Sequence, residues 1–346
     1  MPCGAAFAHH LAVTIAGVSD SAAPWSPWTA DVLDGFEAST DGRITLVRPL
    51  PGSPLAIRAP RAVLLHVPGY NDYFFHSHLV AALAQAGYAV VAMDGTAAGR
   101  SLRPGQIPHA MARIEEPGDD IAHAAARVAQ MYPGVPLVVH AHSTGGLAAA
   151  IWAADRPHPT LAALILNAPL MGRHERLTRR LGSVALPLLA RWRPHMVVSH
   201  HPSVYATGLR EEAGGAWHFD TRWKRPEGLP ARASWAAAVR SAQRRIAHGH
   251  VTIAVPVLVA SSARSGAERW DNPHRHREDI VVSVEAIDRL APRLGTRITR
   301  VKIPDAVHDP SLSAPVPRER YCAEVIGWLD RTLAHQDVPV TPPEPS

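Results

Sequence analysis

The sequence predicts an α/β protein with a mostly parallel central sheet, helices on both faces and a helical cap insertion. Continuous apolar runs over 62–67 and 88–93 are typical of strands that are buried on both faces of a parallel sheet. Helix-like segments separate most of these runs, and such alternation favours a sheet that helices cover on both sides. With 346 residues, of which 47% are hydrophobic, the chain can bury a large core.

The elements are expected in a regular order along the chain. Residues 36–40 and 44–48 flank Asp41-Gly42, a pair typical of the turn in an antiparallel hairpin. A helix is expected over 76–86, because Gly87 is a suitable residue to end it. Further strands are expected from 137 up to the serine at 143 and over 161–166, 251–260 and 296–303, and further helices over 119–131 and 316–335.

Breaks in this alternation suggest the domain plan. Residues 1–30 show little periodicity and are predicted to be an irregular lead-in, and the Pro-rich residues 337–346 are predicted to be a disordered tail. The α/β core is expected over 31–169 and 251–336. Residues 170–250 are predicted to form a cap or lid over an active-site mouth, or else a peripheral decoration. This insertion holds four tryptophans: Trp192, Trp217, Trp223 and Trp235.

Composition excludes several classes of protein. The formal net charge is +5, but the arginines are mixed with acids and no basic run alternates with aromatic residues, so nucleic-acid binding is not expected. No stretch reaches the roughly 18 apolar residues of a membrane span, so no stable membrane insertion is expected. Cys3 and Cys322 cannot build a disulfide framework. A cytoplasmic location is predicted, with secretion the alternative, because the apolar stretch 11–18 lacks preceding basic residues.

One serine stands where an apolar strand ends and an alanine-rich helical stretch begins. Ser143 follows the apolar run that starts at Leu137 and precedes Thr144-Gly145-Gly146. This pattern is typical of a nucleophile elbow, a sharp strand-to-helix turn that exposes one hydroxyl. The turn requires small residues two positions to either side, and Ala141 and Gly145 meet that need. The alternative is a turn without chemistry.

A serine hydroxyl is a weak nucleophile, so the elbow predicts a histidine base and an acid that orients it. His308 follows the last expected strand, where a loop opens at the same sheet edge as the elbow. The order Ser, acid, His leaves four candidates after the strand at 251–260. They are Glu268, Asp271, Glu278 and Asp279. Asp279 is favoured and Asp271 is second, because Asp271 falls in an excursion rich in Arg, His and Trp.

A tetrahedral intermediate also needs backbone donors for its oxyanion. The N–H of Thr144, directly after the nucleophile, is one predicted donor. The other should come from the loop after the strand at 62–67, which reads Pro68-Gly69-Tyr70-Asn71-Asp72. Proline has no N–H and Gly69 allows a tight bend, so the N–H of Tyr70 is the predicted second donor.

Three blocks in this order resemble the α/β-hydrolase superfamily, in the branch of monoacylglycerol lipases and serine aminopeptidase-like hydrolases. The blocks are residues 67–74, 94–101 and 142–146, and the resemblance extends over about 35–335. It also points to Asp279 as the acid. Two residues depart from the family pattern: Pro68 replaces a histidine in the oxyanion loop, and Ala141 replaces the first glycine of the elbow. Neither departure removes a catalytic group.

The resulting prediction is a serine hydrolase that cleaves a small-molecule carboxylic ester, of the carboxylesterase or monoacylglycerol lipase type. No cofactor is required for this chemistry. An acyltransferase or peptidase on the same scaffold, or a non-catalytic binding protein, are the alternatives. His248, His250, His274 and His276 have H-x-H spacings, but no carboxylate or cysteine completes a ligand set, so no metal is expected.

Overall fold

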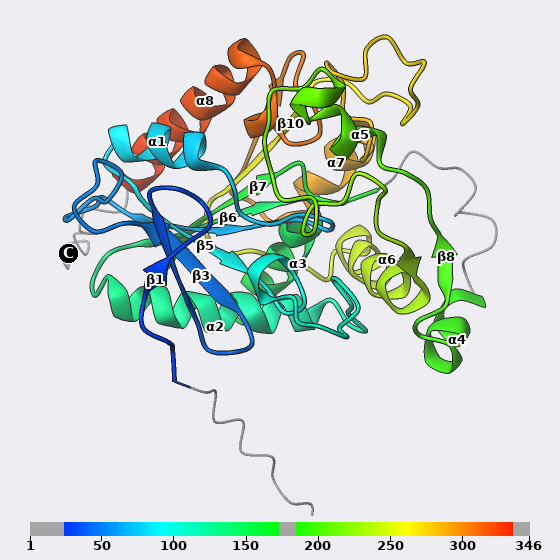
Figure 1. Ribbon diagram of the computed structural model, residues 1–346, viewed down its shortest axis with the longest axis horizontal. Coiled ribbons are helices and arrows are strands. Elements are labelled where there is room, and N and C mark those ends of the chain that lie inside the picture. The colour runs from blue at the N-terminus through cyan, green and yellow to red at the C-terminus, as the bar shows by residue number, and fades with distance from the viewer. Residues whose placement is uncertain (1–23, 173–184, 335–346) are drawn as a thin grey trace, which may run out of the picture.

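The computed structural model describes residues 24–172 and 185–334, and these contain a central sheet of nine strands (Figure 1). From one edge to the other, the strands are β1 (Thr29–Ala30), β2 (Phe36–Thr40), β3 (Thr45–Pro49), β5 (Ala89–Asp94), β4 (Val63–Val67), β6 (Leu137–His142), β7 (Leu161–Asn167), β10 (Val257–Ser262) and β11 (Ile298–Ile303). The first three strands are antiparallel, and β3 also pairs antiparallel with β5. From β5 to β11 all pairs are parallel.

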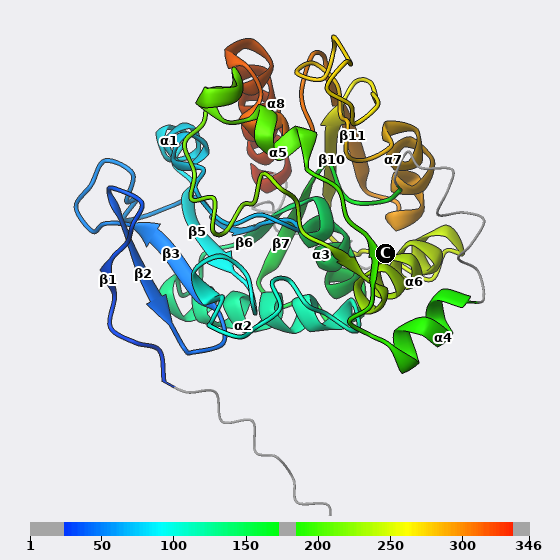
Figure 2. The same ribbon diagram turned by 45° about the vertical axis from the view of Figure 1, so that its right-hand side comes forward.

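Helices cover both faces of the sheet (Figures 1 and 2). One face packs against α1 (Ser77–Gln85) and α8 (Pro315–Ala334), and the other against α2 (Glu115–Met131), α3 (Ser143–Asp155) and α6 (Ala233–Ala247). Successive side chains of a strand point to opposite faces. In β4, Val63 and Leu65 therefore join the core beneath α2 and α3, and Leu64 joins the core beneath α1 and α8. This double burial explains the continuous apolar runs of the sequence.

A long excursion separates β7 from α6. Its described part contains α4 (Ala185–Trp192), β8 (Val197–Ser199), α5 (Val204–Gly208) and β9 (Ala231–Arg232). β8 and β9 pair as a small antiparallel sheet apart from the central one. Helix α6, which ends the excursion, packs through Trp235, Ala238 and Val239 into the core that α2 and α3 share. After β10, the chain forms α7 (Val284–Leu290) before it enters β11.

The predicted α/β fold class, a mostly parallel sheet with helices on both faces, is confirmed. Two local expectations differ. The strand predicted over 251–260 begins at Val257, because Ile253 donates its N–H to the carbonyl of Leu294 rather than to a neighbouring strand. Thr29–Ala30 form a short strand within the predicted irregular lead-in. Residues 1–23, 173–184 and the predicted tail 337–346 lie outside the described residues. None of the described helices is long and apolar enough to cross a membrane.

Candidate active site

Ser143 lies at the junction of β6 and α3, where the backbone bends sharply. Its φ of 52° is in the left-handed region, which a residue with a Cβ adopts at a cost of order 1–3 kcal/mol. The bend brings α3 close to the chain after β4. A Cβ placed on Gly145 would stand 2.2 Å from the carbonyl oxygen of Pro68, so glycine is required there. This strained turn presents the Ser143 hydroxyl at the carboxyl edge of the sheet.

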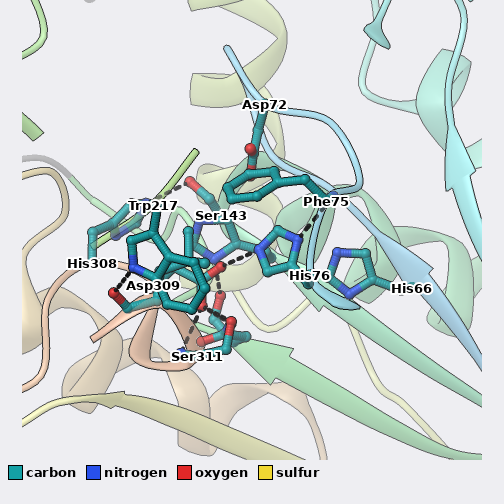
Figure 3. Close-up of polar contacts among 12 residues, drawn as sticks. His66, Asp72, Phe75, His76, Ser143, Trp217, His308, Asp309 and Ser311 are labelled. Atoms are coloured by element: carbon teal, nitrogen blue, oxygen red, sulfur yellow. Dashed lines mark hydrogen bonds and ion pairs between the residues drawn. The ribbon is translucent and has the colours of Figure 1, made fainter. Parts of the chain in front are cut away.

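The His308 imidazole lies beside Ser143 (Figure 3). It connects the serine to a carboxylate through two hydrogen bonds. His308 Nε2 lies 3.0 Å from Ser143 Oγ, and its Nδ1 lies 2.9 Å from Asp279 Oδ2. His308 and Asp279 are buried, with 3% and 0% of their surface exposed. These three residues come from three separate loops that follow parallel strands of the sheet. The arrangement is the one in which a histidine can take a proton from a serine while a carboxylate fixes its tautomer.

The other three candidate acids lie elsewhere. Asp271 is exposed and forms an ion pair with Arg269 through an oxygen 2.5 Å from the guanidinium. Glu268 lines the cavity beside Ser143. Glu278 lies against Gly266, in the segment between β10 and α7 that also holds the other candidates. Of the four, Asp279 is the one within hydrogen-bond distance of His308.

Residues 68–73, hereafter the oxyanion loop, pack directly against the elbow. A Cβ on Gly69 would stand 2.9 Å from the Cβ of Ser143, so the peptide that follows Gly69 runs beside Ser143. Tyr70 and Thr144 both line the cavity at Ser143. Thr144 also stands in the first turn of α3, where backbone N–H groups have no partner within the helix. Both predicted oxyanion donors therefore lie near the Ser143 hydroxyl.

Asp309 follows His308 in the chain and organises the loop that carries it. One carboxylate oxygen accepts a hydrogen bond from His76 Nε2 at 3.1 Å, and the other accepts from Asn167 Nδ2 at 2.8 Å and from Ser311. Burial would raise the pKa of Asp309, but the nearby imidazole of His142 and the bonds from His76 and Ser311 outweigh it and hold that pKa well below its usual value. A buried, ionised Asp309 thus fixes the backbone next to His308 (Figure 3).

Three further histidines lie on the strands behind the site. His66 and His140 contact each other through their Nδ1 atoms at 3.0 Å, and His140 Nε2 lies 2.7 Å from the hydroxyl of Tyr321. Burial lowers the pKa of His140 to about 4. His142 lies 3.0 Å from the carbonyl of Asn167 and its ring is 4.7 Å from that of His308, and burial lowers its pKa to about 4 as well. These imidazoles are therefore neutral near pH 7.

A cavity of about 110 Å³ adjoins Ser143, and the excursion before and within α6 supplies part of its wall. Tyr205, Lys224 and Trp235 of this excursion line the cavity together with Tyr70 and Asp72 of the oxyanion loop. A second cavity of about 300 Å³ shares Tyr70 and Trp235 with the first. Its wall includes apolar residues from β5, from the segment before α2 and from the start of α2, namely Met93, Met111 and Pro117.

Histidine pairs with metal-like spacing do not gather into a site. The rings of His248 and His250 lie 5.9 Å apart. Among residues 24–172 and 185–334, no group of three or more His, Cys, Asp or Glu side chains is placed to hold a metal ion.

Several residues at the site were not found from the sequence. Asp309 is adjacent to His308, and a carboxylate beside a candidate base was a usable signal. His76 and Lys224 carry no such signal, because their partners, Asp309 and Asp72, lie 233 and 152 residues away in the chain. The structure also pairs Arg100 with Asp94, whose Nη1 and Oδ2 atoms lie 2.8 Å apart.

Fold and site together define a hydrolase with the α/β-hydrolase fold. A family model described as serine aminopeptidase, S33, matches residues 58–265, which is more than half of the chain. The chain therefore belongs to the serine aminopeptidase S33 family of α/β hydrolases, which confirms the resemblance. A comparison with curated proteins finds no matching sequence.

Solved structures agree on the fold. A soluble variant of the monoglyceride lipase of Saccharomyces cerevisiae matches at 15% identity with a TM-score of 0.63, over 88% of this chain and 94% of that one. The monoacylglycerol lipase of Paleococcus ferrophilus matches at 20% identity with a TM-score of 0.60, over 80% and 96%. A carboxyl esterase of Bacillus coagulans, solved in complex with glycerol, matches at 14% identity with a TM-score of 0.57, over 89% and 99%. At these identities the likeness establishes the shared fold.

Proposed function

We propose that this protein is a serine hydrolase that cleaves a carboxylic ester through an acyl-enzyme. The observation that carries the proposal is the continuous line of hydrogen bonds from Ser143 through His308 to Asp279. The strained backbone of Ser143 supports it, because strain of this kind is typical of reactive serines.

In the proposed reaction, Ser143 Oγ attacks the ester carbonyl carbon while His308 Nε2 takes the hydroxyl proton. The negative charge that develops on the carbonyl oxygen is stabilised by the backbone N–H groups of Tyr70 and Thr144. His308 then returns its proton to the leaving alcohol as the carbon–oxygen bond breaks. Water, activated by the same imidazole, attacks the acyl-enzyme and releases the carboxylic acid and the free serine. Asp279 holds the imidazole and stabilises its charged form throughout.

Residues 170–250 act in this proposal as the cap that shapes the substrate site. Tyr205, Lys224 and Trp235 from this segment line the cavity at Ser143, which supports the assignment. The cavity at the serine is small, and the larger one that adjoins Tyr70 and Trp235 has an apolar part. We therefore expect an ester with one compact part and one larger apolar part, of the monoacylglycerol or aromatic ester type.

The proposal is tested by combining covalent labelling with turnover. A fluorophosphonate probe should label the wild-type protein and leave Ser143→Ala unlabelled. A panel of p-nitrophenyl esters and monoacylglycerols of increasing chain length should give turnover that Ser143→Ala abolishes. Absence of both labelling and turnover would leave a non-catalytic binding protein as the better interpretation.

A peptidase is the second candidate, because the matching family is described as serine aminopeptidase and Glu268 lines the cavity. A carboxylate in the wall could bind the amino group of a peptide. Aminoacyl amide substrates included in the same panel separate peptide from ester cleavage. Product analysis with added alcohols separates hydrolysis from acyl transfer.

A further inference from the structure

Four consecutive residues of the oxyanion loop bind one short stretch of the excursion, residues 220–230, hereafter the cap segment. The bonds are Tyr70 hydroxyl to the carbonyl of Pro230 at 3.0 Å, Asn71 to the backbone of Arg225 twice at 2.9 Å, Asp72 Oδ1 to Lys224 Nζ at 2.7 Å, and the Asp220 N–H to the Tyr73 hydroxyl at 2.7 Å. Bonds from four successive residues to one segment hold the loop along its length.

Asn71 makes the most specific of these contacts. Its side-chain amide donates to the carbonyl of Arg225 and accepts from the N–H of the same residue, so the amide pairs with that backbone as a neighbouring strand would. Asn71 also has a φ of 57°, a left-handed conformation that asparagine adopts more readily than most residues. The cap segment therefore binds both the NH₂ and the oxygen of the Asn71 amide. This fixes the direction of the chain directly after Tyr70.

Lys224 anchors the same segment from within the protein. The ammonium group and the Asp72 carboxylate are buried, with 4% and 3% of their side chains exposed. The ammonium also lies within 6 Å of the ring centres of Phe75, Tyr205 and Phe219, where cation–π attraction adds to the ion pair. Moving the cap segment away would leave an unpaired charge in a buried site, which is costly.

The oxyanion loop has a reason to depend on such support. Its peptide after Gly69 runs beside Ser143, and its first residue, Pro68, has no N–H with which to brace the turn. Electrostatic stabilisation of an oxyanion requires donors that are held in place before the reaction begins. Displacement by about 1 Å can cost about a hundredfold in rate.

We propose that Asn71 and Lys224 are positioning residues that hold the Tyr70 N–H toward the oxyanion, so that the cap segment is an integral part of the oxyanion hole. This inference rests on the proposed function. It implies that the cap segment cannot swing away during turnover without dismantling the hole, and that the substrate enters and leaves elsewhere around the excursion.

The test uses the full-length protein with Asn71→Gly. Glycine adopts the same left-handed φ, so this variant removes the amide contacts and leaves the turn permitted. Tyr73→Phe removes the hydroxyl that accepts the Asp220 N–H, and so breaks a second contact between the loop and the cap segment. Thr207→Val is the matched control, since Thr207 Oγ1 donates to the carbonyl of Pro226 in the same cap segment but does not touch the oxyanion loop.

Two measurements are made on each variant. With the best ester substrate, Asn71→Gly should lower kcat about ten- to a hundredfold and change KM less than about threefold, because the lost alignment acts in the transition state. Hydrogen exchange of the peptide that spans residues 69–75, measured without substrate, should become faster. Tyr73→Phe should also lower kcat and speed hydrogen exchange, but by less than Asn71→Gly. Thr207→Val should change neither kcat nor hydrogen exchange by more than about twofold.

The outcomes separate this inference from the proposed function. Unchanged hydrogen exchange in Asn71→Gly would show that the cap segment does not hold the loop, and faster exchange with unchanged kcat would show that the loop does not serve catalysis; either overturns the inference while ester hydrolysis by the wild type stands. A wild-type protein that neither hydrolyses any ester nor reacts with the fluorophosphonate would reject the proposed function itself, and the role assigned to Asn71 with it.

Discussion

The Asp279 carboxylate divides its two oxygens between the His308 imidazole and the protein backbone. Oδ2 lies 2.9 Å from His308 Nδ1, whereas Oδ1 accepts the N–H groups of Val281 and Val282 at 2.9 and 2.8 Å. The backbone bonds hold the carboxylate in one orientation, so the tautomer of His308 with its proton on Nδ1 is favoured.

Replacing Asp279 by asparagine should therefore damage catalysis far more than folding. The amide can turn its NH₂ toward Nδ1 and favour the wrong tautomer, and kcat should fall by about four orders of magnitude. Asp271→Asn is the control, because Asp271 is exposed and pairs with Arg269 away from His308. Steady-state kinetics on one ester decides the matter. Equal losses in the two variants, or a loss confined to Asp271→Asn, would remove Asp279 from the proposed mechanism.

The buried pair of Lys224 and Asp72 makes a separate prediction about stability. Lys224→Met leaves the Asp72 carboxylate buried without its counter-charge and should lower the free energy of unfolding by about 3–5 kcal/mol. The double variant Lys224→Met with Asp72→Leu removes both charges and should recover most of that loss. Urea unfolding of the two single variants and the double variant measures the coupling. Additive losses would mean that the two charges do not stabilise each other.

Much of the sheet and the order of its elements could be predicted from the sequence, for a local reason. A strand such as Val63–Val67 is apolar at four of its five positions because alternate side chains enter two different cores, and this requirement shows in the residues of the strand itself. The position of Ser143 was similarly visible, because a strained turn between strand and helix requires small residues at set distances along the chain.

The contacts that hold the site together could not be predicted in the same way. Asp309 meets His76 and Asn167 only because three strands and their loops converge, and no local pattern in the sequence encodes those distances. The two hydrogen bonds between the Asn71 amide and the Arg225 backbone depend on where the excursion places Arg225. Tertiary packing also shortened the strand expected from residue 251, where Ile253 bonds to Leu294 instead.

The buried imidazoles predict how stability responds to pH. Burial holds the pKa of His140 and of His142 at about 4 in the folded protein, whereas an unfolded histidine has a pKa of about 6.5. Between these values the unfolded chain binds more protons, so stability is fully present above about pH 6.5 and is lost as the pH falls toward 4. Each of the two residues should contribute a slope of about 1.4 kcal/mol per pH unit over this range.

This slope can be assigned to one residue by substitution. In His142→Asn the amide can still donate to the carbonyl of Asn167, and one titrating group is gone. The free energy of unfolding is measured with urea at several values between pH 4.5 and 6.5. Its slope against pH should be lower than in the wild type by about 1.4 kcal/mol per pH unit, which corresponds to one proton. An unaltered slope would mean that His142 takes up no proton when the protein unfolds.

The close approach of α3 to the oxyanion loop makes the last prediction, through two glycines that differ in their surroundings. A Cβ at Gly145 would stand 2.2 Å from the carbonyl oxygen of Pro68, a backbone atom that cannot turn aside, so Gly145→Ala must push the elbow and the oxyanion loop apart. We expect a loss of about 1–3 kcal/mol in stability and at least about a hundredfold in kcat, because both the nucleophile and its donors move. At Gly118, in the first turns of α2, the nearest atom would stand 3.6 Å from an added Cβ, so Gly118→Ala should keep full activity and gain up to about 1 kcal/mol from helix propensity. Thermal unfolding and ester turnover of both variants measure the contrast. A Gly145→Ala protein as stable and active as the wild type would show that α3 does not approach the oxyanion loop so closely.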